Sequence, residues 1–166
     1  MTTDAHIEMN IDADRLALTQ TLQAMIIDYW HDVDMNWGRN AADYFVPDAR
    51  WEGDDFCLGS NREEIRDFYT RRERQGGRVT FHAVENFRAF FDGAPDRARC
   101  EWVMVLWGGD GVPVLPTAPP NLIDFVTERW VLTDEGWRIA HRGSNPLFRG
   151  GQLLKLAPRD DTESDS

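Results

Sequence analysis

The order of two hydrophobic patterns along this chain limits the folds that it can adopt. Helical periodicity dominates up to about residue 75, and strand-like runs separated by turn signals fill most of the remainder. Helices followed by a series of long strands predict an α+β domain, because an amphipathic helix must bury its apolar side against the sheet. We therefore expect helices packed on one face of a curved, mostly antiparallel sheet.

The first expected helix begins near residue 12 and carries a regular apolar stripe. Asp12 or Asp14 can cap it, because an aspartate oxygen accepts a hydrogen bond from the first helical turn. The apolar residues recur at the spacing of one helix face: Leu18, Leu22, Met25, Ile26, Tyr29 and Val33. We expect this face to be buried against the sheet.

Two further helices are expected before the main strands. One covers about 37–45 and stops before Pro47, since the residue before a proline disfavours helical backbone. The other covers about 61–75, where the segment Ser60-Asn-Arg-Glu63 has the spacing of a capping box and Gly76-Gly77 ends the helix. The chain therefore predicts three N-terminal helices in all.

Strand-like segments make up the rest of the fold. A short hairpin is expected at 49–58, between the second and third helices. The longer runs end at turn signals such as Asp92-Gly93, and they cover 79–91, 98–107, 122–133 and 137–142. Residues 108–120, rich in Gly and Pro, form a long connection. A sheet of this kind wrapped over helices forms a cone with an open mouth, which is a natural pocket.

Length and composition limit the classes of function. The 166 residues suit one compact domain, expected at 12–150, between polar segments at 1–11 and 151–166. The formal net charge of −11 argues against nucleic acid and anionic membranes as partners, because both carry the same sign. Cys57 and Cys100 do not make a disulfide framework, and no signal peptide or spanning apolar run is visible, so we expect a cytoplasmic protein.

One basic cluster departs from the acidic composition. It comprises 71–74, which holds three arginines, and Arg78, and we interpret it as a solvated helix end where cations complement the helix dipole. The sequence has no metal-ligand spacing such as His-x-His or His-Glu-x-x-His, no phosphate-binding loop and no nucleophile elbow. We therefore expect neither a metal nor a cofactor.

Asp34 and His82 are the candidates for acid–base chemistry. Asp34 lies at the end of the first expected helix, and His82 lies near the start of the strand at 79–91. A neutral imidazole is a competent base because its ordinary pKa is about 6.5. A carboxylate bonded to Nδ1–H fixes the tautomer and leaves Nε2 to take a proton. Without such a partner, a histidine at a strand start is more often a hydrogen-bonded core residue.

Five short segments occur in a characteristic order: YFVPDARW at 44–51, GSNREEI at 59–65, HAVEN at 82–86, DEGWRIAHR at 134–142 and PLFRG at 146–150. Taken together, they resemble the SnoaL-like branch of the nuclear transport factor 2-like (NTF2-like) superfamily. The resemblance implies an NTF2-like cone, in which three N-terminal helices pack on a curved, mostly antiparallel sheet around an open pocket. It also implies assembly through the outer face of the sheet into a homodimer or homotrimer.

The resemblance also implies roles for particular residues. Scytalone dehydratases and hexachlorocyclohexane dehydrochlorinases, within this superfamily, have a catalytic Asp and His at the positions of Asp34 and His82. His82 would thus be a general base that Asp34 orients. The residues that polarise the substrate in those enzymes are not found at the corresponding positions of this chain. Val33 occupies the position of a Tyr, Tyr29 occupies the position of a Lys, and the stretch 101–107 contains no His. We expect Tyr29 to take their place at a substrate oxygen.

Further residues are candidates to line the pocket and bind substrate: Trp51, Asn86, Trp107, Asn121, Asp124, His141 and Arg142. Strand parity puts His141 and Arg142 on opposite faces, so one of them faces the pocket and the sequence leaves open which. The chain has seven Trp, and this aromatic content suits a flat ligand.

These features predict a cofactor-independent lyase or isomerase that acts on a small, hydrophobic cyclic or aromatic molecule. Elimination of the dehydratase type is favoured, while double-bond isomerisation and retro-aldol cleavage would use the same base. One alternative is the non-catalytic small (beta) subunit of a ring-hydroxylating dioxygenase, which shares the fold and a strand like GWRIA at 136–140. Another is a module that binds a small ligand without catalysis.

Overall fold

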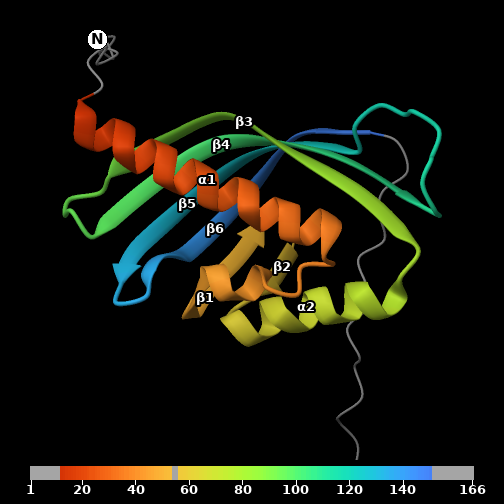
Figure 1. Ribbon diagram of the computed structural model, residues 1–166, viewed down its shortest axis with the longest axis horizontal. Coiled ribbons are helices and arrows are strands. Elements are labelled where there is room, and N and C mark those ends of the chain that lie inside the picture. Colours follow the sequence, from red (N-terminus) through yellow and green to blue (C-terminus); the bar gives the residue numbers. More distant parts are fainter. Residues whose placement is uncertain (1–11, 54–55, 151–166) are drawn as a thin grey trace, which may run out of the picture.

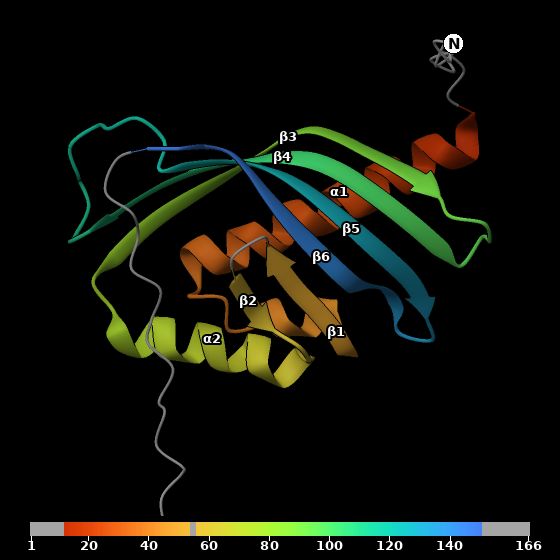
Figure 2. The ribbon, with the colours of Figure 1, turned by 180° about the vertical axis from the view of Figure 1, so that it is seen from behind.

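The computed structural model describes residues 12–53 and 56–150, so the polar segments expected at 1–11 and 151–166 lie outside the described residues. Within these residues, six strands form one sheet in the order β2-β1-β6-β5-β4-β3. Helix α1 (Ala13–Met35) runs across one face of the curved sheet, and α2 (Arg62–Gln75) lies beside the short strands β1 and β2 (Figure 1). Figure 2 shows the opposite face of the long strands, which no helix of the described chain covers. The α+β class is as expected.

Helix α1 forms where its pattern predicts. The Asp12 side chain caps it by accepting a 2.7 Å hydrogen bond from the backbone N–H of Arg15. The buried face consists of Leu18, Leu22, Ile26, Tyr29, Trp30 and Val33. Burial stabilises by about 1.5–3 kcal/mol for each large aliphatic side chain, so this face anchors α1 on the sheet. As a result Asp34, in the last turn, contacts β3 (Arg78–Phe91).

The second helix expected at 37–45 is wrong. The described chain has only a short 3₁₀ turn there, η1 (Ala41–Tyr44), and therefore two α-helices instead of three. Trp37 and Gly38 have φ angles of 62° and 75°, a left-handed backbone that interrupts a helix directly after α1. Gly38 also lies against the Tyr69 ring, which a Cβ at this position would overlap.

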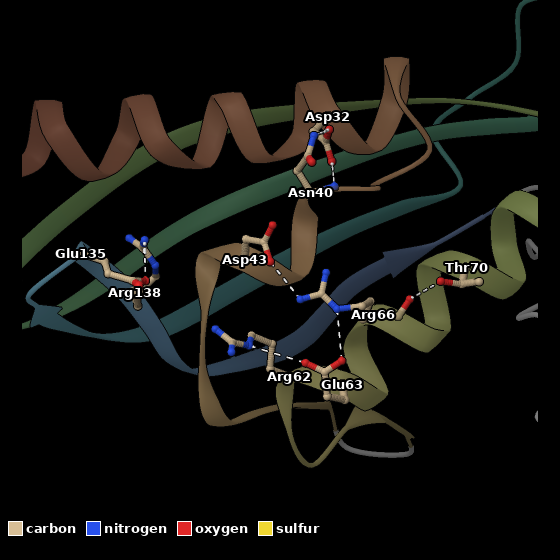
Figure 3. Close-up of polar contacts among 9 residues, drawn as sticks. All are labelled: Asp32, Asn40, Asp43, Arg62, Glu63, Arg66, Thr70, Glu135 and Arg138. Carbon is tan, nitrogen blue, oxygen red and sulfur yellow. Dashed lines mark hydrogen bonds and ion pairs between the residues drawn. The ribbon is translucent and has the colours of Figure 1, made fainter.

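Polar contacts hold η1 between the two helices (Figure 3). The Asp32 carboxylate accepts hydrogen bonds from the Asn40 backbone N–H at 2.9 Å and from its Nδ2 at 2.8 Å. On the other side, Arg66 Nη2 of α2 donates to Asp43 Oδ1 at 2.9 Å, and Arg66 Nε donates to Glu63 Oε2 at 3.2 Å. Exposed pairs contribute about 0–1 kcal/mol each, so they orient the loop more than they stabilise it.

Helix α2 begins one residue later than the expected capping box. The cap is Asn61, whose Oδ1 accepts from the backbone N–H of Glu64 at 3.0 Å, while Glu64 Oε2 accepts from the backbone N–H of Ser60 at 2.9 Å. The two side chains of the cap are thus those of Asn61 and Glu64, one residue later than the expected Ser60 and Glu63, and Glu64 accepts from the backbone N–H of Ser60, where a capping box would use that of the cap residue. Gly76, at φ 59°, ends the helix as predicted.

Three of the four long strands extend beyond the residues that their sequence patterns indicate. Their bounds are Phe45–Gly53 (β1), Phe56–Gly59 (β2), Arg78–Phe91 (β3), Arg97–Asp110 (β4), Leu122–Thr133 (β5) and Gly136–Arg149 (β6). β1 and β6 are parallel and the other neighbouring pairs are antiparallel, so the sheet is mixed. β6 continues past Arg142, where we expected it to end, because its register shift opposite Asp124 accommodates Pro146.

The candidate functional residues lie on the face of the sheet that is turned toward the helices. Side chains alternate between faces along a strand, so residues two apart share a face. Those on the helix side include Thr80 and His82 of β3, Met104 and Leu106 of β4, Asp124 and Glu128 of β5, and Arg142 and Ser144 of β6. Within the part of the chain that the structure describes, no helix is long and apolar enough to cross a membrane.

Candidate active site

A cavity of about 410 Å³ lies between the helices and this face of the sheet. Its volume is within the range of about 300–1,000 Å³ that is usual for small-molecule sites. Most of the wall is aromatic or aliphatic, with contributions from Trp30, Trp51, Phe68, Tyr69 and Leu106. Nine of the twenty lining residues are polar, and six of these are ionisable: Arg72, Arg78, His82, Asp124, Arg142 and Arg149.

Asp34 and His82 are in direct contact at the cavity wall. Asp34 Oδ1 lies 2.7 Å from His82 Nδ1, and Asp34 Oδ2 accepts from the His82 backbone N–H at 2.8 Å. The two side chains are 5% and 7% exposed, respectively, and His82 lines the cavity. A carboxylate on Nδ1 keeps the proton on that nitrogen, so Nε2 is the nitrogen that can accept another.

The surroundings set the charges of this pair. Burial lowers the pKa of His82 below its ordinary value, and the Asp34 carboxylate offsets only part of this effect. Burial opposes ionisation of Asp34, but hydrogen bonds from His82 and Thr80 outweigh it and hold the pKa of Asp34 below its ordinary value. At neutral pH the pair therefore consists of a neutral imidazole and an ionised carboxylate, which is the state a general base requires.

A chain of hydrogen bonds fixes Asp34 from behind. Thr80 Oγ1 donates to Asp34 Oδ1 at 2.7 Å, and Arg72 Nη2 of α2 donates to Thr80 Oγ1 at 2.5 Å. On its other side the His82 ring stacks on Trp30, with centroids 4.0 Å apart and an interplanar angle of 14°. The imidazole therefore has little freedom to turn.

Arg142 provides a buried cation in the cavity wall. Its Nε donates to Glu128 Oε1 at 2.6 Å, and both side chains are at most 1% exposed. The guanidinium lies over the rings of Tyr29 and Trp51, 4.3 and 4.8 Å from the centroids. Neither Nη1 nor Nη2 has a hydrogen-bond partner among the described residues. Unpaired buried donors are costly, so a ligand oxygen here would gain strong hydrogen bonds.

Four of the predicted substrate-binding residues line the cavity: Trp51, Asn121, Asp124 and Arg142. His82 lines it as well, and Asp34 lies behind His82 at the hydrogen-bond distances given above. The question left open by strand parity is thereby answered, because Arg142 faces the cavity while His141 pairs with Glu52 at 3.1 Å and is absent from the wall.

Three predicted site residues do not line the cavity of the described chain. Tyr29 is fully buried in the core, where its hydroxyl bonds to that of Tyr69, so its predicted contact with substrate is wrong. Trp107 lies on the outer face, opposite in parity to Leu106, with its ring near Phe81. Asn86 is exposed at φ 53°, at an irregularity of the β3 register that turns it away.

The sequence analysis missed Thr80, Arg72, Tyr69 and Ser144, all of which line the cavity. Thr80 could have been found, because it shares strand parity with His82. Arg72 is 8% exposed, so our interpretation of the arginine cluster as solvated is wrong for this residue. Nothing in its sequence context distinguishes it from Arg71. Among the residues that the structure describes, no three His, Cys, Asp or Glu side chains gather as a metal site would require.

A curved sheet that wraps over helices, with a cavity between them, is the architecture of NTF2-like proteins. The family model described as a SnoaL-like domain matches residues 13–143, so the chain belongs to the SnoaL-like family. The chain has no match among curated proteins.

Solved structures share the fold. A proposed scytalone dehydratase from Novosphingobium aromaticivorans is 19% identical with a TM-score of 0.72, and the match covers 90% of this chain and 98% of that one. An NTF2-like protein with a cystatin-like fold from the same organism is 17% identical, with a TM-score of 0.64 and coverages of 80% and 84%. A proposed aromatic ring hydroxylase, also from that organism, is 21% identical, with a TM-score of 0.64 and coverages of 81% and 90%. Such identities establish the fold alone.

Proposed function

We propose that this chain is a cofactor-independent lyase or isomerase in which His82 is the general base. The observation that carries the proposal is the 2.7 Å contact between His82 Nδ1 and Asp34 Oδ1 in the wall of a largely apolar cavity. Elimination of water is the favoured reaction for two reasons. One structural neighbour is a proposed scytalone dehydratase, and the Asp–His arrangement suits proton abstraction. Isomerisation would use the same first step.

The reaction begins with proton transfer from carbon. His82 Nε2 takes a proton from the carbon next to a substrate carbonyl, and Asp34 stabilises the imidazolium that results. General-base catalysis of this kind contributes about 10²–10⁴-fold. The electron pair moves toward the carbonyl oxygen, where the unpaired Nη groups of Arg142 are the available donors. Expulsion of a hydroxyl from the adjacent carbon then completes the double bond.

The cavity suits a small, neutral and flat substrate. Aromatic rings of Trp30, Trp51 and Phe68 offer stacking surfaces, and about 410 Å³ accommodates a molecule of one or two fused rings. Glu128 balances the charge of Arg142, so this guanidinium is better suited to an oxygen that becomes negative during the reaction than to a permanent anion. With the formal net charge of −11, neither nucleic acid nor an anionic membrane is proposed as a partner.

The test uses the full chain and a fused-ring β-hydroxy ketone, hydroxytetralone, whose dehydration to naphthol is followed by absorbance. We expect turnover by the wild type, a loss of about 10²–10⁴-fold in kcat in His82→Ala, and a smaller loss in Asp34→Asn. The matched control is His31→Ala, an exposed histidine on α1 that should keep wild-type turnover. Equal rates for wild type and His82→Ala above the uncatalysed rate would remove the proposal.

A second candidate is a non-catalytic subunit of an aromatic ring-hydroxylating enzyme. It is favoured by the likeness to a proposed aromatic ring hydroxylase and by apolar side chains on the uncovered face of the sheet, including Phe81 and Phe148. The same assay separates the two, because a subunit of this kind has no turnover by itself. A small-ligand binder would likewise bind hydroxytetralone in His82-dependent fashion without releasing naphthol.

A further inference from the structure

Asp124 is a buried acid that the proton abstraction by His82 does not use. It lines the cavity from β5 and is 1% exposed. Ser144 Oγ donates a hydrogen bond to its Oδ2, whereas Oδ1 has no hydrogen-bond partner within the described chain. An ionised oxygen without a donor is disfavoured when buried, while a protonated carboxyl needs fewer donors and has a hydrogen to give. The geometry thus favours the neutral acid.

The charges around Asp124 agree with this. Burial raises its pKa above the ordinary value, and the hydrogen bonds from Ser144 and the Asn145 backbone, with the charge of Arg149, offset only part of the effect. On β4 the residue in register with Asp124 is Met104, which is apolar. The remaining ionisable groups that line the cavity are His82 and Arg78 on β3, Arg72 on α2 and Arg142, whose charge Glu128 balances.

His82 and Asp124 face one cavity from strands that are not neighbours. β4 lies between them, and in register His82 is opposite Leu106, which is opposite Leu122, two residues before Asp124. Adjacent strands are about 4.8 Å apart, so the two backbones are separated by about 10 Å across the sheet. One small ring fits between a base on one side and an acid on the other.

We propose that Asp124 is the general acid of the elimination, giving its proton to the hydroxyl that leaves the substrate. This inference rests on the proposed function and narrows the substrate class to cyclic β-hydroxy carbonyl compounds. Hydroxide is a poor leaving group, so a base alone does not make the C–O bond easy to break. A general acid that protonates the leaving oxygen lets it depart as water and accelerates the elimination. Elimination needs a deprotonated base and a protonated acid, and the surroundings of His82 and Asp124 favour these two states, respectively.

The proton and electron balance is complete without a further reactant. His82 Nε2 takes the proton from carbon, the C–H electron pair forms the C=C bond, and the C–O bond breaks. The departing oxygen takes the Asp124 proton and leaves as water. The imidazolium proton of His82 then returns to Asp124 through water in the open cavity, which restores both groups. The sum is substrate to unsaturated ketone and water.

The first experiment needs no substrate. The protein is labelled with ¹³C at aspartate Cγ and titrated by NMR, and Asp124→Asn identifies the resonance by its loss. We expect this carboxyl to titrate above the ordinary value of about 3.9. In the control Asp48→Asn, a change at an exposed position on β1, the same resonance should remain. A resonance that titrates at or below the ordinary value would overturn the proposal.

The second experiment varies the leaving group. Acetoxytetralone expels acetate, which needs no protonation, whereas hydroxytetralone expels water. We expect Asp124→Asn to lower kcat/KM for hydroxytetralone by about 10²-fold or more and to leave the acetoxy substrate near the wild-type rate. Its pH profile should change from a bell to a curve that falls only on the acid side, where His82 becomes protonated. Asp48→Asn should match the wild type with both substrates.

The outcomes separate the two proposals. If His82→Ala abolishes both reactions while Asp124→Asn slows both equally, Asp124 has no role at the leaving group, and the proposed function stands without it. If His82→Ala leaves both reactions unchanged, the proposed function fails, but the NMR titration still reports on Asp124 directly. If Asp124→Asn unfolds at the same temperature as the wild type, misfolding is excluded as the cause of a lower rate.

Discussion

Asp34 is bonded at both carboxylate oxygens, and this gives the His82 ring a defined position. Oδ2 accepts from the His82 backbone, while Oδ1 is shared between the His82 ring and Thr80, behind which Arg72 lies. A hydrogen bond to a charged group contributes about 1.5–3 kcal/mol, so turning the ring away would lose the Nδ1 contact with Asp34 together with the stacking on Trp30. The base is therefore oriented before any substrate arrives, which is the kind of preorganisation that catalysis uses.

The pKa of His82 predicts how folding stability depends on pH. Burial lowers this pKa in the folded protein, whereas the unfolded chain has the ordinary value of about 6.5. Between the two values the unfolded chain binds a proton that the folded protein does not, so stability falls as pH decreases through this window. We expect Tm to fall from about pH 7 to pH 5, and to fall less steeply in His82→Gln.

The measurement is a series of thermal unfolding curves across that range. His31→Gln is the control, because His31 is exposed on α1 and its variant should keep the wild-type slope. The depressed pKa of Asp34 acts at lower pH, since its contribution is lost only as pH falls below the ordinary aspartate value. Parallel slopes for wild type and His82→Gln would contradict the assignment of a buried neutral imidazole.

Some of these site residues could be predicted from the sequence and others could not, for physical reasons. Asp34 and His82 were paired because their positions match those of related enzymes, and their contact follows from α1 crossing β3. Tyr29 was misassigned because a helical stripe gives only the buried side of α1, not which of its residues reaches the cavity. Arg72 was missed because its burial depends on how α2 meets the sheet, which no local pattern encodes.

The interruption between α1 and η1 predicts a position that tolerates no side chain. Gly38 combines a φ of 75° with a close approach to the Tyr69 ring, so Gly38→Ala adds both backbone strain and overlap. We expect a loss of about 2–4 kcal/mol in the free energy of unfolding, measured with urea. Gly77→Ala is the matched control, since Gly77 has a φ of 64° with nothing within 4 Å of an added Cβ. Equal losses of unfolding free energy in the two variants would show that backbone strain alone, without overlap with Tyr69, destabilises the protein.

The start of α2 predicts which of two neighbouring residues caps the helix. Asn61→Ala removes the acceptor for the Glu64 backbone N–H and should cost about 0.5–2 kcal/mol of stability. Ser60→Ala should cost less, because the structure uses only the backbone N–H of Ser60 for the cap, as donor to Glu64. Urea unfolding of both variants decides the matter, and a larger loss in Ser60→Ala would support the capping box expected from the sequence instead.

At the level of elements, strands were more predictable than the segment between α1 and β1. β5 matches the expected 122–133 because alternation and flanking turns fix a strand from both ends. The segment at 37–45 has helical composition, but its conformation is set by the approach of Gly38 to Tyr69, a residue of α2 far along the chain. Contacts of this range are invisible to local periodicity.

On the scale of the molecule, the described residues give the sheet one face covered by helices and one face that no helix covers. The uncovered face carries apolar side chains: Phe81 is 56% exposed and Phe148 is 67% exposed, and the Phe81 ring lies 6.0 Å from that of Trp107. Phe148 is in register with Ile123, so these groups extend across β3 to β6. Exposed apolar surface of this kind is typical of protein interaction sites. We therefore propose that two or three copies of the chain associate through it.

If copies associate through this apolar face, a charge placed on it should separate them. Phe81→Glu places a carboxylate on the uncovered face, where each copy would have to bury it on association, so the assembly should dissociate into monomers. Light scattering after size-exclusion chromatography measures the mass over a concentration series. Leu16→Glu is the control, because Leu16 is 48% exposed on α1 and lies away from this face, so its mass should equal that of the wild type. A wild-type chain that is monomeric at every concentration would refute the association, and the apolar face would then require a different partner.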